Sequence, residues 1–233
     1  MNQQLSLPVG LTDAATFENF YSGRSAEAVK RIQYAVLPSS GDRCIYIWGE
    51  PGSGKTHLLH AAMRRAAEHE VRSVYLPLFD KTLTIDALEG LDETDLIGVD
   101  DVQAIAKRPY WEAALFSVHE RVYTRRATLL VTGNAPPAQL TLSMRDLATR
   151  LAGRLVYQIV PLNDEEKLGA LKLRAKHRGF VIGDDVARYI LQRYPRDAKA
   201  LFSLLDRIDR ASLAQQRRIT IPFLRSLEQD DAG

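Results

Sequence analysis

The sequence predicts an α/β domain built on a parallel five-stranded sheet flanked by helices, followed by a small all-helical domain. Short apolar runs predict the five strands, at residues 44–48, 73–78, 96–99, 128–132 and 156–160. Longer segments with helical spacing of apolar residues lie between them, at 56–69 and 110–126. Because strands alternate with helices, we expect a parallel sheet with helices on both faces.

The strand pattern stops at Pro161, and the rest of the chain is predicted to be helical. Asn163 and the acidic residues 164–166 form a helix start, because a capping side chain and negative charge stabilise the positive end of a helix. The predicted helices cover 167–177, 184–194 and 198–216, and a final helix opens near 220 before a frayed tail at 228–233. The predicted domains are therefore a flexible tail at 1–10, an α/β domain at 11–162 and a helical domain at 163–233.

The composition is that of a folded, soluble protein. Of 233 residues, 45% are hydrophobic and 26% are charged, which excludes disordered, collagen-like and coiled-coil classes. No run approaches the roughly 20 apolar residues that cross a bilayer, and the N-terminus lacks a secretion signal, so we expect a cytoplasmic protein with no membrane partner. The net charge of +2 is too small to wrap nucleic acid over a broad face. The single cysteine, Cys44, is expected in the core.

The most specific motif is a phosphate-binding loop between a predicted strand and a predicted helix. The segment 49–56 reads Gly-Glu-Pro-Gly-Ser-Gly-Lys-Thr and matches G-x-x-x-x-G-K-[ST] at every required position. Glycines let the loop curl so that backbone N–H groups face an anion, and the helix N-terminus adds partial positive charge. We expect nucleotide contacts from Gly49, Pro51, Gly52, Ser53, Gly54, Lys55 and Thr56.

Two aspartates follow the third predicted strand, as in a Walker B segment. Asp100 is expected to support a Mg²⁺ ion together with the hydroxyl of Thr56, and Asp101 is expected to polarise the attacking water. Many ATPases have glutamate at the second position. Aspartate is one methylene shorter, which sets the base back by roughly 1–1.5 Å, enough to slow hydrolysis. Whether the chain is itself an effective enzyme therefore stays open.

These residues, taken in order, resemble the AAA+ ATPases, and specifically their DnaA branch. The segment Thr16-Phe17-Glu18-Asn19-Phe20, followed by Gly23-Arg24-Ser25, is similar to the part of DnaA that encloses the adenine, and the paired aspartates are the DnaA-like Walker B form. The resemblance implies a P-loop fold with a helical lid. It also assigns Asn134 as sensor 1, Arg150 as the arginine finger of box VII and Arg196 as sensor 2.

The assignments of Asn134 and Arg150 also have plainer interpretations. A lone asparagine before Pro136-Pro137 is more often a turn residue. Arg150 lies near Arg145 and Arg154, and an arginine-rich helix is usually a solvated face. Arg196 begins a predicted helix, where a cation is unfavourable against the helix dipole, and this suits a residue that is held there to meet phosphate.

The N-terminal segment carries a second resemblance. Gln4-Leu5-Ser6-Leu7-Pro8 is similar to the short peptide by which replication proteins bind the β sliding clamp of DNA polymerase III. Leu5 and Leu7 would fill an apolar pocket, Gln4 would supply hydrogen bonds, and Pro8 would lower the entropic cost of docking. The N-terminal interaction domain and the DNA-reading domain of DnaA are not expected in this chain.

The combination resembles the regulatory inactivators of DnaA, which are negative regulators of replication initiation. That resemblance implies a clamp-bound protein that promotes hydrolysis of DnaA-bound ATP through Arg150 supplied in trans. It implies DnaA and the clamp as partners, ADP or ATP with Mg²⁺ as cofactors, and contact with DNA only through the clamp.

Two alternatives stay open. The chain could be an independent DnaA-like ATPase, such as a helicase loader or remodeller, or an adaptor that tethers a partner to the clamp without catalysis. The resting nucleotide and a homo-oligomeric state are not fixed by the sequence.

Overall fold

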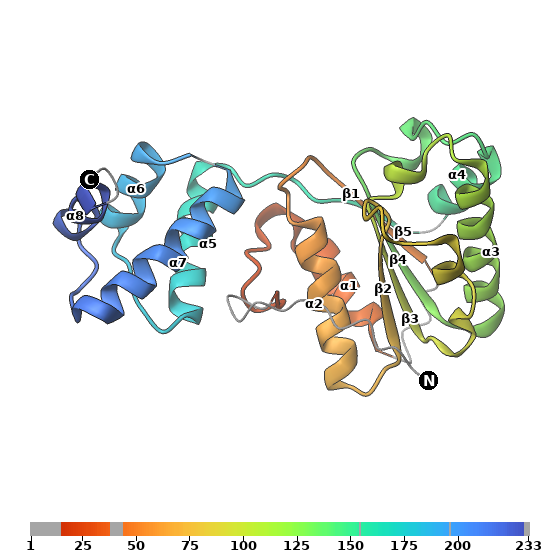
Figure 1. Ribbon diagram of the computed structural model, residues 1–233, viewed down its shortest axis with the longest axis horizontal. Coiled ribbons are helices and arrows are strands. Elements are labelled where there is room, and N and C mark those ends of the chain that lie inside the picture. The colour runs from red at the N-terminus through yellow and green to blue at the C-terminus, as the bar shows by residue number, and fades with distance from the viewer. Residues whose placement is uncertain (1–14, 38–43, 154, 196, 231–233) are drawn as a thin grey trace. The chain divides into compact units, whose positions relative to one another are not determined.

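The computed structural model describes residues 15–37, 44–153, 155–195 and 197–230. Thr16–Asn163 form one compact unit, and the chain from Asp164 onward belongs to a second (Figure 1). Among the described residues, no helix is long and apolar enough to cross a membrane.

The first unit contains the predicted parallel sheet. Its strands pair in the order β2-β3-β4-β1-β5, and every pairing is parallel, so the prediction of a parallel five-stranded sheet is confirmed. The strands are β1 (Cys44–Trp48), β2 (Ser73–Pro77), β3 (Leu96–Asp100), β4 (Thr128–Gly133) and β5 (Leu155–Gln158). The last strand ends two residues before its predicted end. There Val160 N donates to the hydroxyl of Ser25 instead of to a strand.

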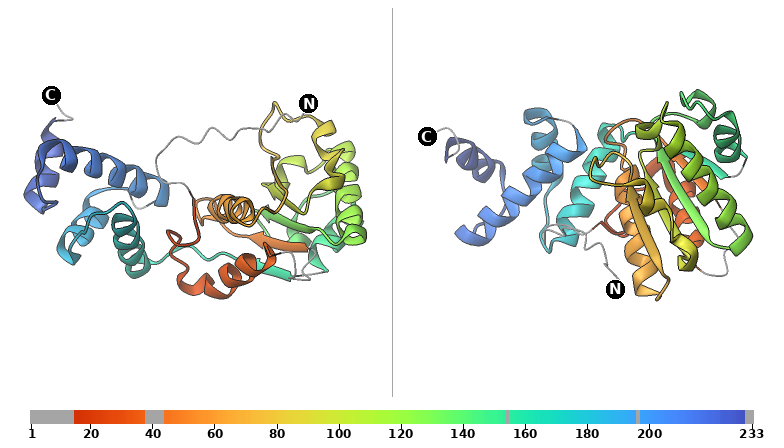
Figure 2. Two further views of the ribbon diagram at one scale, coloured as in Figure 1. Left: turned by 90° about the horizontal axis from the view of Figure 1, so that it is seen from below. Right: turned by 45° about the vertical axis from the view of Figure 1, so that its right-hand side comes forward.

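Helices cover both faces of the sheet, as Figures 1 and 2 show. Ile45 and Ile47 of β1 face a core shared with α1 and α2, whereas Cys44 and Tyr46 face the opposite core, shared with α3 and α4. This alternation follows from the two-residue period of a strand. The helices are α1 (Ala26–Ala35), α2 (Lys55–Glu68), α3 (Pro109–Arg125) and α4 (Arg145–Ala152). The sequence analysis did not predict α1, and it treated the segment around Arg150 as a helix without giving the bounds of α4. The burial of Cys44 is as expected.

Short 3₁₀ helices shape the connections of the first unit. The link from β2 to β3 contains only two of them, and another follows β3 directly. They are η1 (Gly23–Ser25), η2 (Ile85–Leu88), η3 (Leu91–Glu93), η4 (Val102–Ile105) and η5 (Pro137–Gln139).

The described part of the second unit is helical and has its own apolar core. Asp197 caps its third helix by accepting a hydrogen bond from Ala200 N at 2.8 Å. The helices are α5 (Asp164–His177), α6 (Asp184–Arg193), α7 (Ala198–Gln215) and α8 (Ile221–Asp230). The final helix therefore continues through residues 228–230, where a frayed tail was predicted.

Candidate functional site: a phosphate loop and an exposed arginine

The phosphate loop joins β1 to α2 and needs its glycines. Gly52 and Gly54 have φ angles of +78° and +100°, which L side chains rarely adopt. A Cβ atom on Gly54 would lie 2.6 Å from a ring carbon of Phe20, and one on Gly49 would lie 2.4 Å from Ile159 O. The backbone here is therefore tightly enclosed as well as sharply curled.

Lys55 points its charge into this loop. It is the first residue of α2, its side chain is buried, and its Nζ donates to Gly49 O at 2.9 Å and Glu50 O at 3.0 Å. Burial lowers the pKa of Lys55, and the nearby carboxylates of Asp101 and Asp100 act in the opposite direction. A cation held in such surroundings gains from an anionic ligand.

The remaining loop residues fit a phosphate group. Among the described residues, the buried hydroxyl of Ser53 has no hydrogen-bond partner, so a phosphate oxygen would satisfy it. Pro51 and Gly52 are exposed, as is Thr56 at the first turn of α2. The phosphate loop therefore combines an orphaned donor, a buried cation and a helix N-terminus.

Asp100 ends β3 and is fully buried. The hydroxyl of Tyr75 donates to its Oδ2 at 2.8 Å, and the hydroxyl of Thr132 donates to its Oδ1. Burial and the adjacent Asp100 raise the pKa of Tyr75 far above its ordinary value, so this hydroxyl stays protonated and can donate. Strands on both sides of β3 thus fix the carboxylate in place.

The oxygen groups near the loop suit Mg²⁺ only in combination with a nucleotide. Within the described ranges, no group of three or more His, Cys, Asp or Glu side chains could hold a metal. Mg²⁺ usually keeps several waters and binds one or two protein oxygens plus substrate phosphates. The hydroxyl of Thr56 and the carboxylate of Asp100 are the groups that would serve.

Gln103, which the sequence analysis did not single out, links Asp101 to Asn134 by hydrogen bonds. Gln103 Nε2 donates to Asp101 Oδ1 at 2.8 Å, and Asn134 N donates to Gln103 Oε1 at 3.1 Å. Asp101 itself has a φ of +59°, and its N–H donates to Thr132 Oγ1 at 2.9 Å. The side chain of Gln103 thus bridges the ends of β3 and β4.

The segment resembling the adenine enclosure packs beside the loop. Thr16 and Asn19 exchange hydrogen bonds between backbone N–H and side-chain oxygen, at 3.1 Å and 3.2 Å. His57 Nε2 lies 2.9 Å from Thr16 O, and its ring centre lies 5.4 Å from that of Phe20. These contacts tie the segment to α2, next to Lys55.

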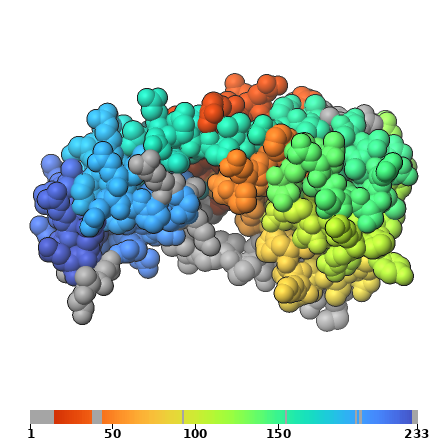
Figure 3. All heavy atoms as spheres, turned by 90° about the horizontal axis from the view of Figure 1, so that it is seen from above, coloured from red at the N-terminus to blue at the C-terminus, as the bar shows by residue number. Residues whose placement is uncertain are grey.

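Arg150 lies on α4 and is only partly covered by the protein. Its side chain is 52% exposed, and its Nε lies 3.2 Å from Glu120 Oε1 of α3. The guanidinium carbon lies 6.0 Å from the ring centre of Phe116, also on α3. Figure 3 shows the green atoms of this part of the chain at the surface of the first unit.

A buried acid on α3 fixes the start of α4. Glu112 is fully buried, and its Oε1 accepts from Lys107 N at 2.8 Å and Ser143 N at 3.1 Å, while Oε2 accepts from Met144 N at 2.6 Å. Met144 is the N-cap of α4. Sequence reasoning missed Glu112, although an acid within an apolar helical pattern was a visible signal.

Several residues predicted to be functional lie outside the described residues. They are Gln4, Leu5, Leu7, Pro8 and Arg196. Their predicted roles in clamp binding and nucleotide sensing stay predictions.

Comparison with known proteins now places the chain in a family. Residues 11–158 match the family described as the bacterial DnaA ATPase domain, and residues 164–227 match the family described as the lid domain of Hda.

Solved structures share the fold. Domain III of the replication initiation protein DnaA from Thermotoga maritima superposes with a TM-score of 0.75 at 18% identity, over 94% of this chain and 97% of that one. AMPPCP-bound DnaA from Aquifex aeolicus superposes with a TM-score of 0.72 at 22% identity, over 96% of this chain and 71% of that one. A DNA replication initiation factor gives 0.67 at 23% identity, over 84% of this chain and 64% of that one, so the match spans less than two thirds of that protein. The chain therefore belongs to the bacterial DnaA ATPase family and is a DnaA-like AAA+ protein whose lid is of the Hda type.

Proposed function

We propose that this protein is a negative regulator of replication initiation, which binds the β sliding clamp and promotes hydrolysis of DnaA-bound ATP. Arg150 would enter the nucleotide site of a neighbouring DnaA molecule and neutralise charge that develops on the transferred phosphoryl group. Arginines supplied in trans accelerate GTPases by roughly 10³–10⁵-fold in this way. The half-exposed guanidinium of Arg150 is the observation that carries the proposal, because a residue that acts on another molecule must be reachable from outside.

The protein's own nucleotide site has a supporting role in this proposal. The phosphate loop, Lys55 and Ser53 would hold the phosphates of ADP or ATP, with the adenine beside the segment at 16–20. AMPPCP in the DnaA relative makes a nucleotide the natural ligand for this loop. Mg²⁺, bound through Thr56 and supported by Asp100, would supply charge neutralisation at the phosphates. Bound nucleotide would chiefly fix the conformation of the chain, in keeping with the short side chain of Asp101.

The clamp supplies the second half of the proposal. The segment from Gln4 to Pro8 would dock on the clamp and bring Arg150 to replication sites, so that contact with DNA is indirect and the protein acts in the cytoplasm.

Binding of purified clamp tests this half directly. The parent and a Leu5→Ala, Leu7→Ala variant are compared, with Leu213→Ala as a control, because Leu213 is an exposed leucine of the lid. We expect the double variant alone to lose clamp binding. If the parent itself does not bind clamp, the regulatory proposal fails.

An independent ATPase is the second candidate. The complete phosphate loop together with Asp100, Asp101 and Asn134 at the ends of adjacent strands favours it. It predicts substantial ATP turnover without any partner, abolished by Lys55→Ala. The third possibility, a non-catalytic adaptor, predicts that Arg150→Ala leaves DnaA inactivation intact while loss of Leu5 and Leu7 abolishes it.

A further inference from the structure

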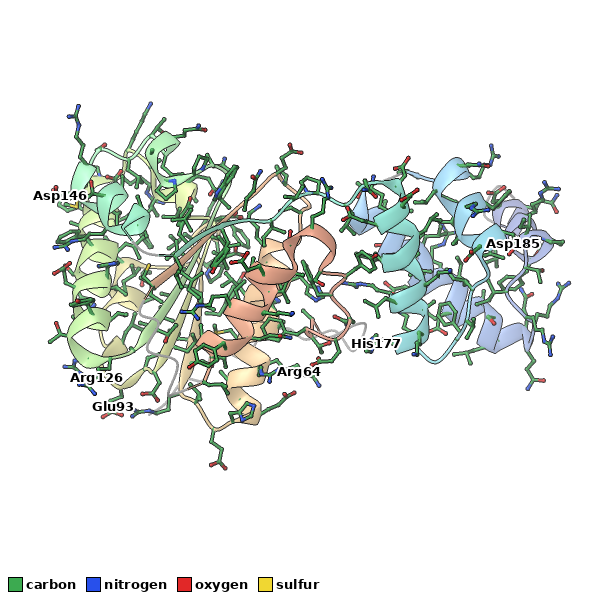
Figure 4. The ribbon with its side chains drawn as sticks, turned by 180° about the vertical axis from the view of Figure 1, so that it is seen from behind. Arg64, Glu93, Arg126, Asp146, His177 and Asp185 are labelled. Carbon is green, nitrogen blue, oxygen red and sulfur yellow. The ribbon has the colours of Figure 1, made fainter. Side chains whose placement is uncertain are left out.

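Helix α3 presents three residues to α4 at intervals of four positions. They are Glu112, Phe116 and Glu120. Residues four apart lie on one face of a helix, so the three form a row along α3. Figure 4 shows α3 and α4 with their side chains, with Asp146 of α4 labelled.

The two ends of this row act on different parts of α4. Glu112 holds the backbone at the N-cap of α4, through Ser143 N and Met144 N. Glu120 holds the side chain of Arg150 near the other end of the helix, through its Nε. One helix therefore fixes both the backbone that carries Arg150 and the direction of its guanidinium.

The atom that Glu120 contacts matters for what Arg150 can do. A guanidinium presents its donors on two edges, and the ion pair uses Nε. A guanidinium binds a phosphate in bidentate fashion either through its two terminal nitrogens or through Nε and one of them. A carboxylate close to Nε favours the first of these modes for a second ligand. Glu120 Oε1 also lies 3.5 Å from Nδ1 of the buried His119.

We propose that Glu120 is a positioning residue for Arg150: its carboxylate, 3.2 Å from Nε, holds the exposed side chain in one orientation beside α3, where it can meet a phosphate of a partner's nucleotide. The inference rests on the proposed function. An arginine side chain loses much rotamer freedom when it is fixed, and this ion pair restricts that freedom before the partner binds.

Kinetics of DnaA-bound ATP hydrolysis test the positioning role. We expect Glu120→Ala to lower the stimulated rate at saturating DnaA by about threefold to tenfold, with an unchanged half-saturating concentration, because orientation matters in the transition state. Glu120→Gln keeps an acceptor oxygen and should recover part of the rate. A purely electrostatic effect would instead make the two variants equal.

A matched control is available on α2. Glu68 Oε1 lies 3.3 Å from Arg64 Nε, and the two side chains are 60% and 51% exposed, close to the 45% and 52% of Glu120 and Arg150. Arg64 is labelled in Figure 4. Glu68→Ala removes the same charge from an ion pair of similar exposure, although this pair lies within one helix, and it should leave the stimulated rate unchanged.

A spectroscopic measurement reports on the contact without DnaA. In ¹⁵N-labelled protein, the Nε–H signal of Arg150, identified by its loss in Arg150→Ala, should change its chemical shift in Glu120→Ala, because the carboxylate lies 3.2 Å from Nε in the parent.

The outcomes separate the two proposals. If Arg150→Ala abolishes stimulation while Glu120→Ala keeps the parent rate and the parent Nε–H chemical shift, the positioning role is overturned and the proposed function stands. If Arg150→Ala itself stimulates like the parent, the finger assignment fails and the positioning role fails with it.

Discussion

The phosphate loop and helix α4, which carries Arg150, differ in how far their charged side chains are exposed to solvent. Lys55 and Asp100 are 7% and 0% exposed, and their charged atoms contact groups of the same chain. The side chain of Arg150 is 52% exposed and forms an ion pair with Glu120, in which Nε lies 3.2 Å from Oε1. The charged groups beside the loop are thus enclosed by the protein, whereas Arg150 is open to solvent, as its proposed role on another molecule requires.

The two regions also differ in the contacts that hold their side chains in place. Asp100 accepts hydrogen bonds from Tyr75 and Thr132 on the neighbouring strands. Asp101 accepts one from Gln103 of η4 and donates its N–H to Thr132, so these acids are fixed at the carboxyl ends of the strands. Arg150 depends on one neighbouring helix, α3. Changes on α3 should therefore alter action on a partner without altering nucleotide binding, and changes in the loop should do the reverse.

The largest expected effect is the loss of nucleotide affinity in the Lys55→Ala variant. Loss of this buried cation beside the phosphate loop should weaken ADP and ATP binding by about 100-fold or more, since charge-assisted hydrogen bonds to phosphate are strong. Titration calorimetry with Mg²⁺ measures the change. Lys30→Ala, at an exposed lysine of α1, should bind like the parent. Full affinity in Lys55→Ala would contradict the site assignment.

The next effect is on stability. Glu112→Ala leaves Lys107 N, Ser143 N and Met144 N without their acceptor, so the free energy of unfolding should fall by about 2–3 kcal/mol. Urea denaturation followed by circular dichroism checks this, and Glu112→Gln, which keeps an acceptor oxygen, should lose less. An unchanged unfolding midpoint in Glu112→Ala would show that α4 starts without this support.

A moderate effect is expected from lengthening Asp101. Asp101→Glu restores the reach of a catalytic base and should raise the protein's own ATP hydrolysis by about tenfold, measured as phosphate release. Asp101→Asn, which removes the base, is the control and should give no rise. If Asp101→Glu hydrolyses no faster than the parent, side-chain length is not what limits turnover.

The smallest effect concerns pH. Burial lowers the pKa of His60 below its ordinary value of 6.5, with the Asp100 carboxylate opposing. As pH falls below 6.5, the unfolded chain takes up a proton at His60 before the folded chain does, so stability declines until the lower folded pKa is reached. His60→Phe, which keeps the ring that packs edge-on against Tyr75, should reduce that decline. Identical pH profiles of the unfolding free energy would contradict this.

The sheet and the phosphate loop could be predicted because both depend on short-range patterns. Apolar runs predicted all five strands, and eight consecutive residues specified the loop. The eight-residue helix α4 shows only two buried leucines, Leu147 and Leu151, too few for a periodic signal.

The hydrogen bonds that hold these two regions in place could not be predicted, because they join residues far apart in the sequence. Glu112 contacts residues 31 and 32 positions later, and Thr132 contacts a residue 32 positions earlier. Gln103 bridges Asp101 to Asn134 only because β3 and β4 are adjacent in the sheet. Such roles follow from the topology, which one sequence specifies only coarsely.

The central claim is that Arg150 acts on a nucleotide held by another molecule. Single-turnover hydrolysis of DnaA-bound ATP, with clamp loaded on DNA, tests it most directly with the parent, Arg150→Ala and Arg150→Lys. We predict that Arg150→Ala binds clamp and nucleotide normally but lowers the stimulated rate by about 10³-fold, and that lysine fails to restore it, because a point charge does not replace the planar fork. Stimulation by Arg150→Ala at the parent rate would contradict the account.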